Sequence, residues 1–169
     1  MAIPALLAVA GLHHYLIRNK KRNEIDILVE TGEAREIMHF ALLIGYGATA
    51  INPYLALDSI EYMVKNKLYL NADESEIKDL QYNYLKAQKK SILKTMSKMG
   101  ISTVDSYRGA QIFEAVGLST ELVKKYFTGT VSRIEGLTIK TLEDEVLNNF
   151  DDAIDSINLG AETLYVDGE

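Results

Sequence analysis

Three histidines are the side chains in this sequence best suited to bind a metal ion or to transfer a proton. His13 and His14 are adjacent, so on a helix they point to different faces, and no carboxylate lies at ligand spacing from them. His39 stands alone on the apolar face of another predicted helix. Because metal sites gather several ligands, we interpret all three as packed, hydrogen-bonded histidines rather than as metal ligands.

A glycine-containing segment, Gly45-Tyr46-Gly47-Ala48-Thr49-Ala50, matches the letters G-x-G-x-x-A of the dinucleotide-binding fingerprint. That fingerprint needs a strand before the glycines and a helix after them, so that helix N–H groups meet the pyrophosphate. Here the pattern predicts a helix before the glycines and a short strand after them. We therefore expect Gly45 and Gly47 to end a helix rather than to bind a nucleotide.

The turn Glu30-Thr31-Gly32-Glu33 follows a predicted strand and precedes a predicted helix, which is where open α/β sheets bind ligands. Glu30 and Glu33 would repel a phosphate at this place. We interpret these acidic residues as complementing the positive N-terminal end of a helix.

A second polar group surrounds a turn that we expect between a strand and a helix, and it comprises Ser97-Lys98, Ser106-Tyr107-Arg108 and Gln111. These side chains could hold an anion, and loop capping explains them equally well. Arg108 is the residue best suited to an anionic substrate, because a guanidinium beside a helix N-terminus matches a carboxylate or a phosphate.

Composition limits the classes of function. The chain has 169 residues, 47% of them hydrophobic and 25% charged, as in an ordinary soluble globular protein with one core or two small ones. The net charge of −6 gives no general attraction to nucleic acid or to an anionic membrane. There is no cysteine, so the chain can offer no disulfide, thiolate-bound zinc, cysteine-held iron–sulfur cluster or cysteine nucleophile. The apolar run 1–12 is interrupted by histidines and predicts a buried helix rather than a signal peptide or a membrane span.

The elements that must position these residues follow the pattern of parallel strand–helix units. We predict an α/β fold with a short parallel sheet of about three strands flanked by helices, and with additional helices toward the C-terminus. The predicted strands are 25–29, 49–52 and 101–104. The predicted helices are 4–19, 34–45, 54–65, 76–99, 105–116, 120–127 and 140–156, with a loop at 128–137. The cations Arg18, Lys20 and Lys21 stand at the end of the first helix, where the helix dipole favours them. The basic cluster that they form with Arg22 is too short to imply binding to nucleic acid or to a membrane.

Longer strings carry a resemblance to a known family. VETGEAREIMHFALLIGYGATAINPYLAL (29–57), LKTMSKMGISTVDSYRGAQIFEAVGLS (93–119) and YFTGTVSRIEGL (126–137) resemble consecutive blocks of the glutamate synthase large subunit, in the family's order. HHYLI (13–17) resembles the helix before the first block, and 161–169 resembles the next family segment only weakly. Such an enzyme is an oxidoreductase that makes two glutamates from glutamine and 2-oxoglutarate, using FMN and a 3Fe–4S cluster.

The resemblance implies a division of the chain. Residues 1–65 would be the C-terminal part of the central α/β domain, 66–100 a connection with a long helix, and 101–169 a strand–helix unit leading into an incomplete FMN-binding domain. The family's cysteine nucleophile and cluster cysteines have no counterpart here, and its paired histidine is replaced by Met38-His39. We therefore predict no catalytic, cofactor-binding or metal-binding residue, and no cofactor, in this chain.

The expected role is that of a cytoplasmic structural piece of glutamate synthase that is inactive alone. Its partners would be the remaining domains or subunits of the enzyme, with self-association when isolated and without nucleic acid or membrane. Two other readings stay open: a free-standing protein-interaction module derived from the enzyme, and a weak anion- or nucleotide-binding domain. The tail 160–169, which lacks a closing element, favours the first reading.

Overall fold

The computed structural model of the protein describes residues 3–68 and 72–159, with side chains up to residue 155. The chain divides into two compact units. The N-terminal unit is Ala5–Phe113, and the C-terminal unit is Glu114–Glu169 together with Met1–Pro4. The predicted tail at 160–169 lies outside the described residues, and the domain boundary predicted between residues 100 and 101 stays a prediction.

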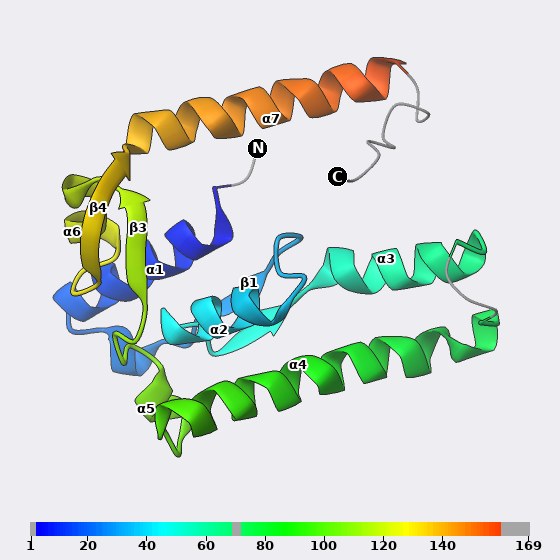
Figure 1. The fold of residues 1–169 in the computed structure, drawn as a ribbon, viewed down its shortest axis with the longest axis horizontal. Coiled ribbons are helices and arrows are strands. Elements are labelled where there is room, and N and C mark those ends of the chain that lie inside the picture. The colour runs from blue at the N-terminus through cyan, green and yellow to red at the C-terminus, as the bar shows by residue number, and fades with distance from the viewer. Residues whose placement is uncertain (1–2, 69–71, 160–169) are drawn as a thin grey trace. The chain divides into compact units, whose positions relative to one another are not determined.

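The N-terminal unit consists of a two-stranded parallel sheet with helices packed beside it (Figure 1). Its elements are α1 (Ala5–Arg18), the 3-10 helix η1 (Arg22–Glu24), β1 (Leu28–Glu30), α2 (Ile37–Gly45), β2 (Ala50–Asn52), α3 (Tyr54–Lys65), the 3-10 helix η2 (Glu74–Glu76), α4 (Ile77–Met99) and α5 (Val104–Tyr107). In the sheet, Leu28 pairs with Ala50 and Glu30 with Asn52. The α/β class and the parallel pairing of the first two predicted strands are therefore confirmed.

The third predicted strand, 101–104, is wrong. Ile101–Thr103 is irregular, and Val104 begins α5, because the Thr103 side chain accepts a hydrogen bond from the backbone N–H of Ser106 at 3.3 Å and caps the helix. The predicted helix 105–116 is also wrong beyond Tyr107. Left-handed backbone at Gly109 and Gln111 stops helical hydrogen bonding there.

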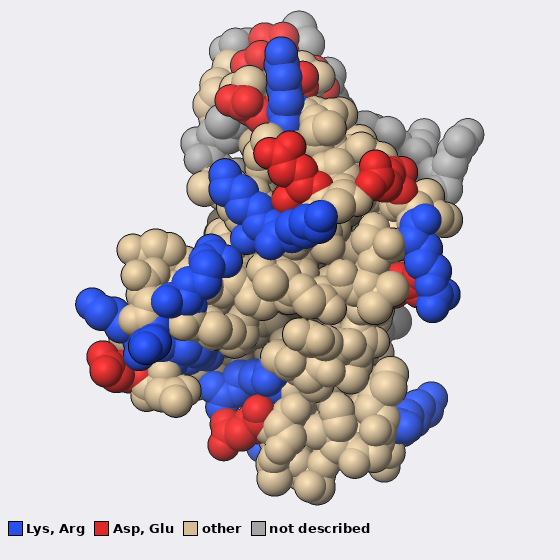
Figure 2. Space-filling view, turned by 90° about the vertical axis from the view of Figure 1, so that its left-hand side faces the viewer, with Lys and Arg blue, Asp and Glu red and all other residues tan. Residues whose placement is uncertain are grey.

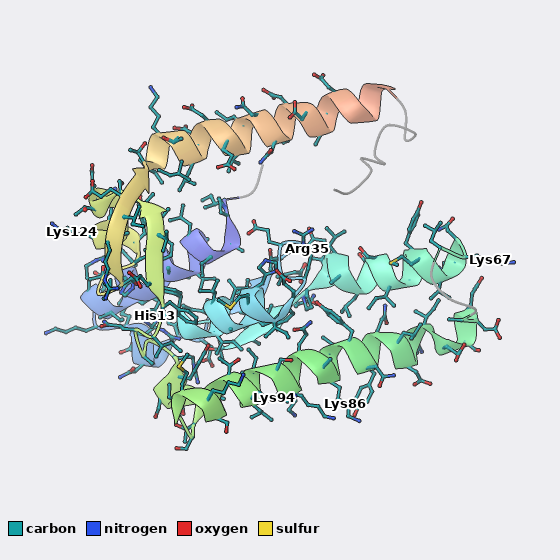
Figure 3. All side chains as sticks on the ribbon, viewed as in Figure 1. His13, Arg35, Lys67, Lys86, Lys94 and Lys124 are labelled. Carbon is teal, nitrogen blue, oxygen red and sulfur yellow. The ribbon has the colours of Figure 1, made fainter. Side chains whose placement is uncertain are left out.

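The core of the N-terminal unit lies between α1, α2, α4 and α5. Tyr107 is fully buried, and its hydroxyl donates a hydrogen bond to the carbonyl oxygen of Ala41 at 3.1 Å. Phe40 meets Tyr84 edge to face, with ring centroids 6.4 Å apart, which joins α2 to α4. The apolar spacing of 76–99 predicts one broad buried face, and buried Ile92 and Met96 confirm it in part, but Leu93 and Met99, which were predicted on the same face, are 55% and 53% exposed. The lysines of α4 are exposed, among them Lys86 and Lys94 (Figure 3).

The C-terminal unit consists of β3 (Glu114–Leu118), α6 (Thr120–Tyr126), β4 (Val131–Leu137) and α7 (Ile139–Leu159). β3 and β4 form a second parallel pair, connected through α6 (Figure 1). The helices predicted at 120–127 and 140–156 are confirmed. The loop predicted at 128–137 is wrong over β4, because Gly136 lies at a register irregularity of the pair rather than in a turn. A Cβ at residue 136 would lie 2.5 Å from the Gly117 carbonyl oxygen.

Candidate functional site

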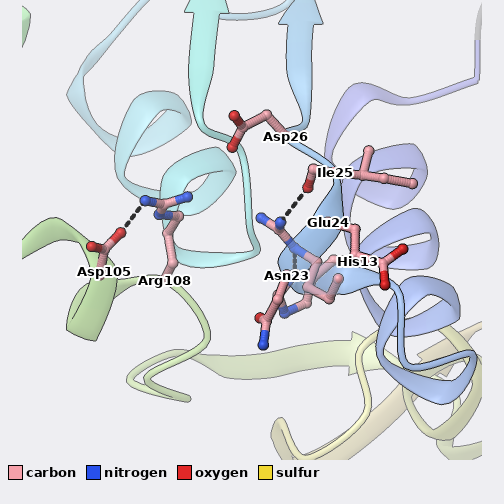
Figure 4. Close-up of a pocket in the computed structure, with 8 residues that line it drawn as sticks. His13, Asn23, Glu24, Ile25, Asp26, Asp105 and Arg108 are labelled. Atoms are coloured by element: carbon pink, nitrogen blue, oxygen red, sulfur yellow. Dashed lines mark hydrogen bonds and ion pairs between the residues drawn. The ribbon is translucent and has the colours of Figure 1, made fainter.

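A polar cavity of about 470 Å³ in the N-terminal unit brings together side chains that are distant in sequence (Figure 4). His13 comes from α1, Arg22 from η1, Asp26 from the segment before β1, and Arg108 follows α5. The titratable groups that line the cavity are His13, Arg22, Glu24, Asp26, Asp105 and Arg108. Because charged groups converge here, this cavity is the candidate site for binding or catalysis.

Arg22 connects three segments of the chain through its guanidinium group. Its Nε donates to His13 Nδ1 at 2.9 Å, Nη1 donates to the Ile25 carbonyl at 2.7 Å, and Nη2 donates to the Gly47 carbonyl at 2.8 Å. These bonds join α1, the segment entering β1, and the turn between α2 and β2. The planar fork of an arginine suits this geometry, so Arg22 acts as a structural clamp.

His13 is a buried histidine whose state follows from this clamp. Its Nδ1 accepts the hydrogen bond from Arg22, so the neutral ring carries its proton on Nε2. Burial, followed by the charges of His14, Arg22 and Arg108, lowers the pKa of His13 from 6.5 to about 4. Burial, followed by the charge of Arg18, also lowers the pKa of His14. At neutral pH His13 is therefore an uncharged acceptor for Arg22.

The lowered pKa predicts a loss of stability in mild acid. The unfolded chain protonates His13 below pH 6.5, whereas the folded chain protonates it only near pH 4. The contribution of neutral His13 to the free energy of unfolding is therefore complete above pH 6.5 and falls as the pH decreases toward 4. Between pH 7 and 5 we expect a loss of roughly 1 to 2 kcal/mol, allowing for solvent screening. Urea unfolding at both pH values measures the loss, and His13→Gln should reduce it. If the free energy of unfolding of His13→Gln fell as much between pH 7 and pH 5 as that of the wild type, the loss could not be assigned to His13.

Arg108 is held by Asp105 of α5 and by Thr49 at the amino end of β2. Its Nη2 is paired with Asp105 Oδ1, and its Nη1 donates to Thr49 Oγ1 at 3.3 Å. The Thr49 hydroxyl in turn donates to Asp26 Oδ1 at 3.0 Å. Asp26 precedes β1 and Thr49 precedes β2, which is the end of a parallel sheet opposite to the one where α/β proteins bind ligands. The guanidinium that we expected to suit an anionic substrate is thus already neutralised by a carboxylate.

The acidic turn at residues 30–33 lies at the other end of the sheet. The Glu33 carboxylate accepts the backbone N–H of Ala5 at 3.2 and 3.0 Å, so it complements the N-terminus of α1 and not that of the following helix. Thr31 Oγ1 accepts the Glu33 backbone N–H at 3.0 Å, and Asn52 donates to Glu30 at 3.2 Å. These bonds give the turn a structural role.

The remaining candidates are dispersed. His39 Nδ1 accepts the backbone N–H of Arg35 at 3.1 Å and of Glu36 at 3.3 Å, as part of a capping box at the start of α2. Ser97 and Lys98 lie in the last turn of α4, and Gln111 is exposed after α5. The glycine segment 45–50 runs from α2 into β2, the order opposite to a dinucleotide fingerprint.

Sequence reasoning missed Arg22, Asp26 and Thr49 as members of the candidate site. Arg22 was interpreted only as a member of a short basic cluster, and nothing in the spacing of Arg22, Asp26 and Thr49 relates them. The available signal was the position of Asp26 and Thr49, each just before a predicted strand, because adjacent parallel strands place such residues side by side.

The described residues contain neither a group that could bind a metal ion nor a helix that could cross a membrane. In residues 3–68 and 72–159 no three His, Asp or Glu side chains are placed to hold a metal ion. Within the same part of the chain, the helices are too short or too polar to cross a membrane.

On the side of the molecule drawn in Figure 2, Lys and Arg side chains alternate with Asp and Glu and with uncharged areas.

Comparison with known proteins gave consistent matches. Residues 1–119 match the family model described as glutamate synthase central domain. The glutamate synthase [NADPH] large chain of Bacillus subtilis is 50% identical over 144 residues, which is 85% of this chain and 9% of that protein. The glutamate synthase [NADH] of Saccharomyces cerevisiae is 46% identical over 152 residues, 88% of this chain and 7% of that protein. The ferredoxin-dependent glutamate synthase of Pyropia yezoensis is 46% identical over 154 residues, 88% of this chain and 10% of that protein. The chain thus spans a tenth or less of the length of these relatives.

Proposed function

Since the chain belongs to the family of the glutamate synthase central domain, we propose that it serves as a scaffold within an enzyme that makes two glutamates from glutamine and 2-oxoglutarate. In this role its side chains hold the domain together and position neighbouring domains. The chemistry takes place on residues outside this chain.

The observation that carries the proposal is the use of the charged groups in the polar cavity. All three hydrogen bonds of Arg22 go to groups that join separate segments, and Arg108 is paired with Asp105 and Thr49. An active site keeps such groups available for a substrate, with pKa values near the working pH. Here the pKa of His13 is lowered to about 4, far from the range of a general base at neutral pH.

The residues of the candidate site fit neither the iron–sulfur cluster nor FMN. The cluster needs cysteine thiolates, and the sequence contains no cysteine. A flavin phosphate needs free cations or helix N–H groups, and in the candidate site Arg108 is neutralised by Asp105. We propose that both groups are bound elsewhere in the enzyme and that the purified chain is colourless.

The partners that we propose are the other domains of a cytoplasmic glutamate synthase. We also propose that the isolated chain self-associates through its N-terminal unit. Support comes from large apolar side chains left exposed there, among them Leu28 at 75%, Tyr62 at 57% and Tyr82 at 62%. Light scattering at increasing concentration measures this, and a monomer at all concentrations would argue against it.

A chimeric enzyme tests the scaffold role. In it, the matching segment of the Bacillus subtilis large chain is replaced by this chain, and glutamate formation is assayed. We expect an active chimera, in which Arg108→Ala and Gln111→Ala keep their turnover once the amounts of folded enzyme are matched. Gln111 is exposed and serves as the control for Arg108. A stably folded Arg108→Ala chimera that loses turnover by orders of magnitude would mean that this residue takes part in the reaction.

A further inference from the structure

Resting on the proposed function, we infer that the C-terminal unit carries a docking surface for a basic, apolar surface elsewhere in the glutamate synthase large chain. The docking surface consists of the uncovered face of β3 and β4 and of the apolar stripe of α7. We call it the acidic docking surface.

The uncovered sheet face is the first part of this surface. Val116 and Ile134 are partners in the register of β3 and β4, and they are 68% and 60% exposed. Val131, near the start of β4, is 52% exposed. α6 packs on the strands with buried side chains at Leu122 and Val123. Parallel sheets are normally covered on both faces, so a pair covered by one helix lacks a layer.

The stripe on α7 is the second part. α7 begins two residues after β4 ends and extends from it as a single helix (Figure 1). Four of its large apolar residues are 40 to 48% exposed and recur at helical spacing, whereas Leu142 and Val146 are partly buried. The four exposed residues are Ile139, Leu147, Phe150 and Ile154. The exposed stripe and the exposed strand residues belong to consecutive elements, β4 and α7, so a single partner can cover both.

Charge identifies the kind of partner. Residues 114–159 contain four Lys or Arg and nine Asp or Glu, so the described C-terminal unit has a net charge of −5. Among the acidic residues of α7, Glu143 and Asp151 lie nearest the apolar stripe by helical spacing, and the single cation Lys140 also lies beside it. Two copies of this surface would bring like charges together, which disfavours a symmetric dimer through it. The occupant must therefore combine apolar side chains with lysine or arginine.

The remaining polypeptide of the large chain is the source of that occupant. The chain corresponds to 9% of the Bacillus subtilis large chain, so most of the enzyme lies outside it. A domain within one polypeptide meets its neighbours through such surfaces at a high effective concentration. If the acidic docking surface had no partner, its exposed apolar side chains would promote aggregation.

Hydrogen exchange in the chimera tests the inference. We compare amide exchange in residues 114–118, 131–137 and 139–155 between the isolated chain and the chimera. In the chimera we expect exchange to slow at least tenfold in these segments, and Ile134→Glu and Phe150→Glu to reverse the slowing. The matched control is Asn83→Glu, which introduces the same charge at an exposed polar residue of α4 in the N-terminal unit. This control should leave the slowing intact.

A second pair of variants tests the charge of the partner. Glu143→Gln with Asp151→Asn changes the charge of the surface by two, and Asp58→Asn with Glu74→Gln makes the same change in the N-terminal unit. Only the first pair should weaken the protection and reduce its dependence on salt. If both pairs of variants weakened the protection and its salt dependence equally, the inference that the partner is basic would be overturned.

The outcomes separate this inference from the proposed function. A chimera that makes glutamate but exchanges these segments as fast as the isolated chain overturns the docking surface alone. Protection already present in the isolated chain, and lost in Ile134→Glu, also overturns it. A chimera that does not fold overturns both the docking surface and the scaffold role.

Discussion

Replacing Gly47 with alanine should lower the free energy of unfolding of the N-terminal unit by about 3 to 5 kcal/mol. Gly47 has a φ of +116°, which an L-residue adopts only with strain. A Cβ there would lie 2.4 Å from Nδ1 and 2.7 Å from Cγ of His13. His13 would have to move, and its hydrogen bond with Arg22 would break. The estimate combines backbone strain, repacking of a buried ring and the loss of that bond.

The matched control is Gly100→Ala. Gly100 also has a positive φ, +71°, but no atom lies within 4 Å of a Cβ built there, so this variant carries the backbone strain alone, about 1 kcal/mol. Urea unfolding followed by tyrosine circular dichroism reports the N-terminal unit, which holds seven of the eight described tyrosines, and the chain has no tryptophan. Equal losses in Gly47→Ala and Gly100→Ala would show that the contact with His13 has no energetic weight.

The helices of this fold could be predicted from sequence because their apolar spacing is local. α4 was predicted at 76–99 and spans Ile77–Met99, with its end marked by Gly100. The parallel pair of β1 and β2 was predictable for a related reason, since each short apolar run stands between a turn and a helix. In both cases the signal lies within a few residues of the element that it specifies.

Outside α6, the segment 101–137 was predicted poorly, and its two strands depend on pairing between residues far apart in sequence. The run Ile101–Val104 has β-branched residues, yet Thr103 caps a helix there and the strand begins only at Glu114. β4 contains Gly136, which suggested a loop, but the residue lies where the strand passes close to Gly117. Pairing between residues far apart in sequence outweighs local propensity in such segments.

The candidate site shows the same limit. Sequence spacing singled out His13 and Arg108 separately, but neither the hydrogen bond from Arg22 to His13 nor the bonds that connect Arg108, Thr49 and Asp26. Those bonds form only after α1, the two strands and α5 have packed together. No local pattern records such a convergence, so the half-buried Arg22 was interpreted only as a member of a short basic cluster.

Replacing Arg22 with methionine should lower the free energy of unfolding of the N-terminal unit by about 3 kcal/mol or more. Methionine keeps the length of the side chain but removes every donor. His13 Nδ1 and the carbonyl oxygens of Ile25 and Gly47 then lose partners that lie at 2.9, 2.7 and 2.8 Å. Hydrogen bonds from a charged donor are worth about 1.5 to 3 kcal/mol each, and water can replace only the bonds that it reaches.

Arg22→Lys is the conservative comparison for this prediction. A lysine keeps the positive charge but cannot satisfy three acceptors at the angles of a guanidinium fork, so its loss of stability should lie between those of wild type and Arg22→Met. A second readout is the pKa of His13 by NMR titration. The charge of Arg22 contributes to lowering this pKa, so it should rise above about 4 in Arg22→Met while burial still holds it below 6.5. If stability and the His13 pKa were both unchanged in Arg22→Met, the clamp would play no part in holding α1, the entry to β1 and the turn before β2 together.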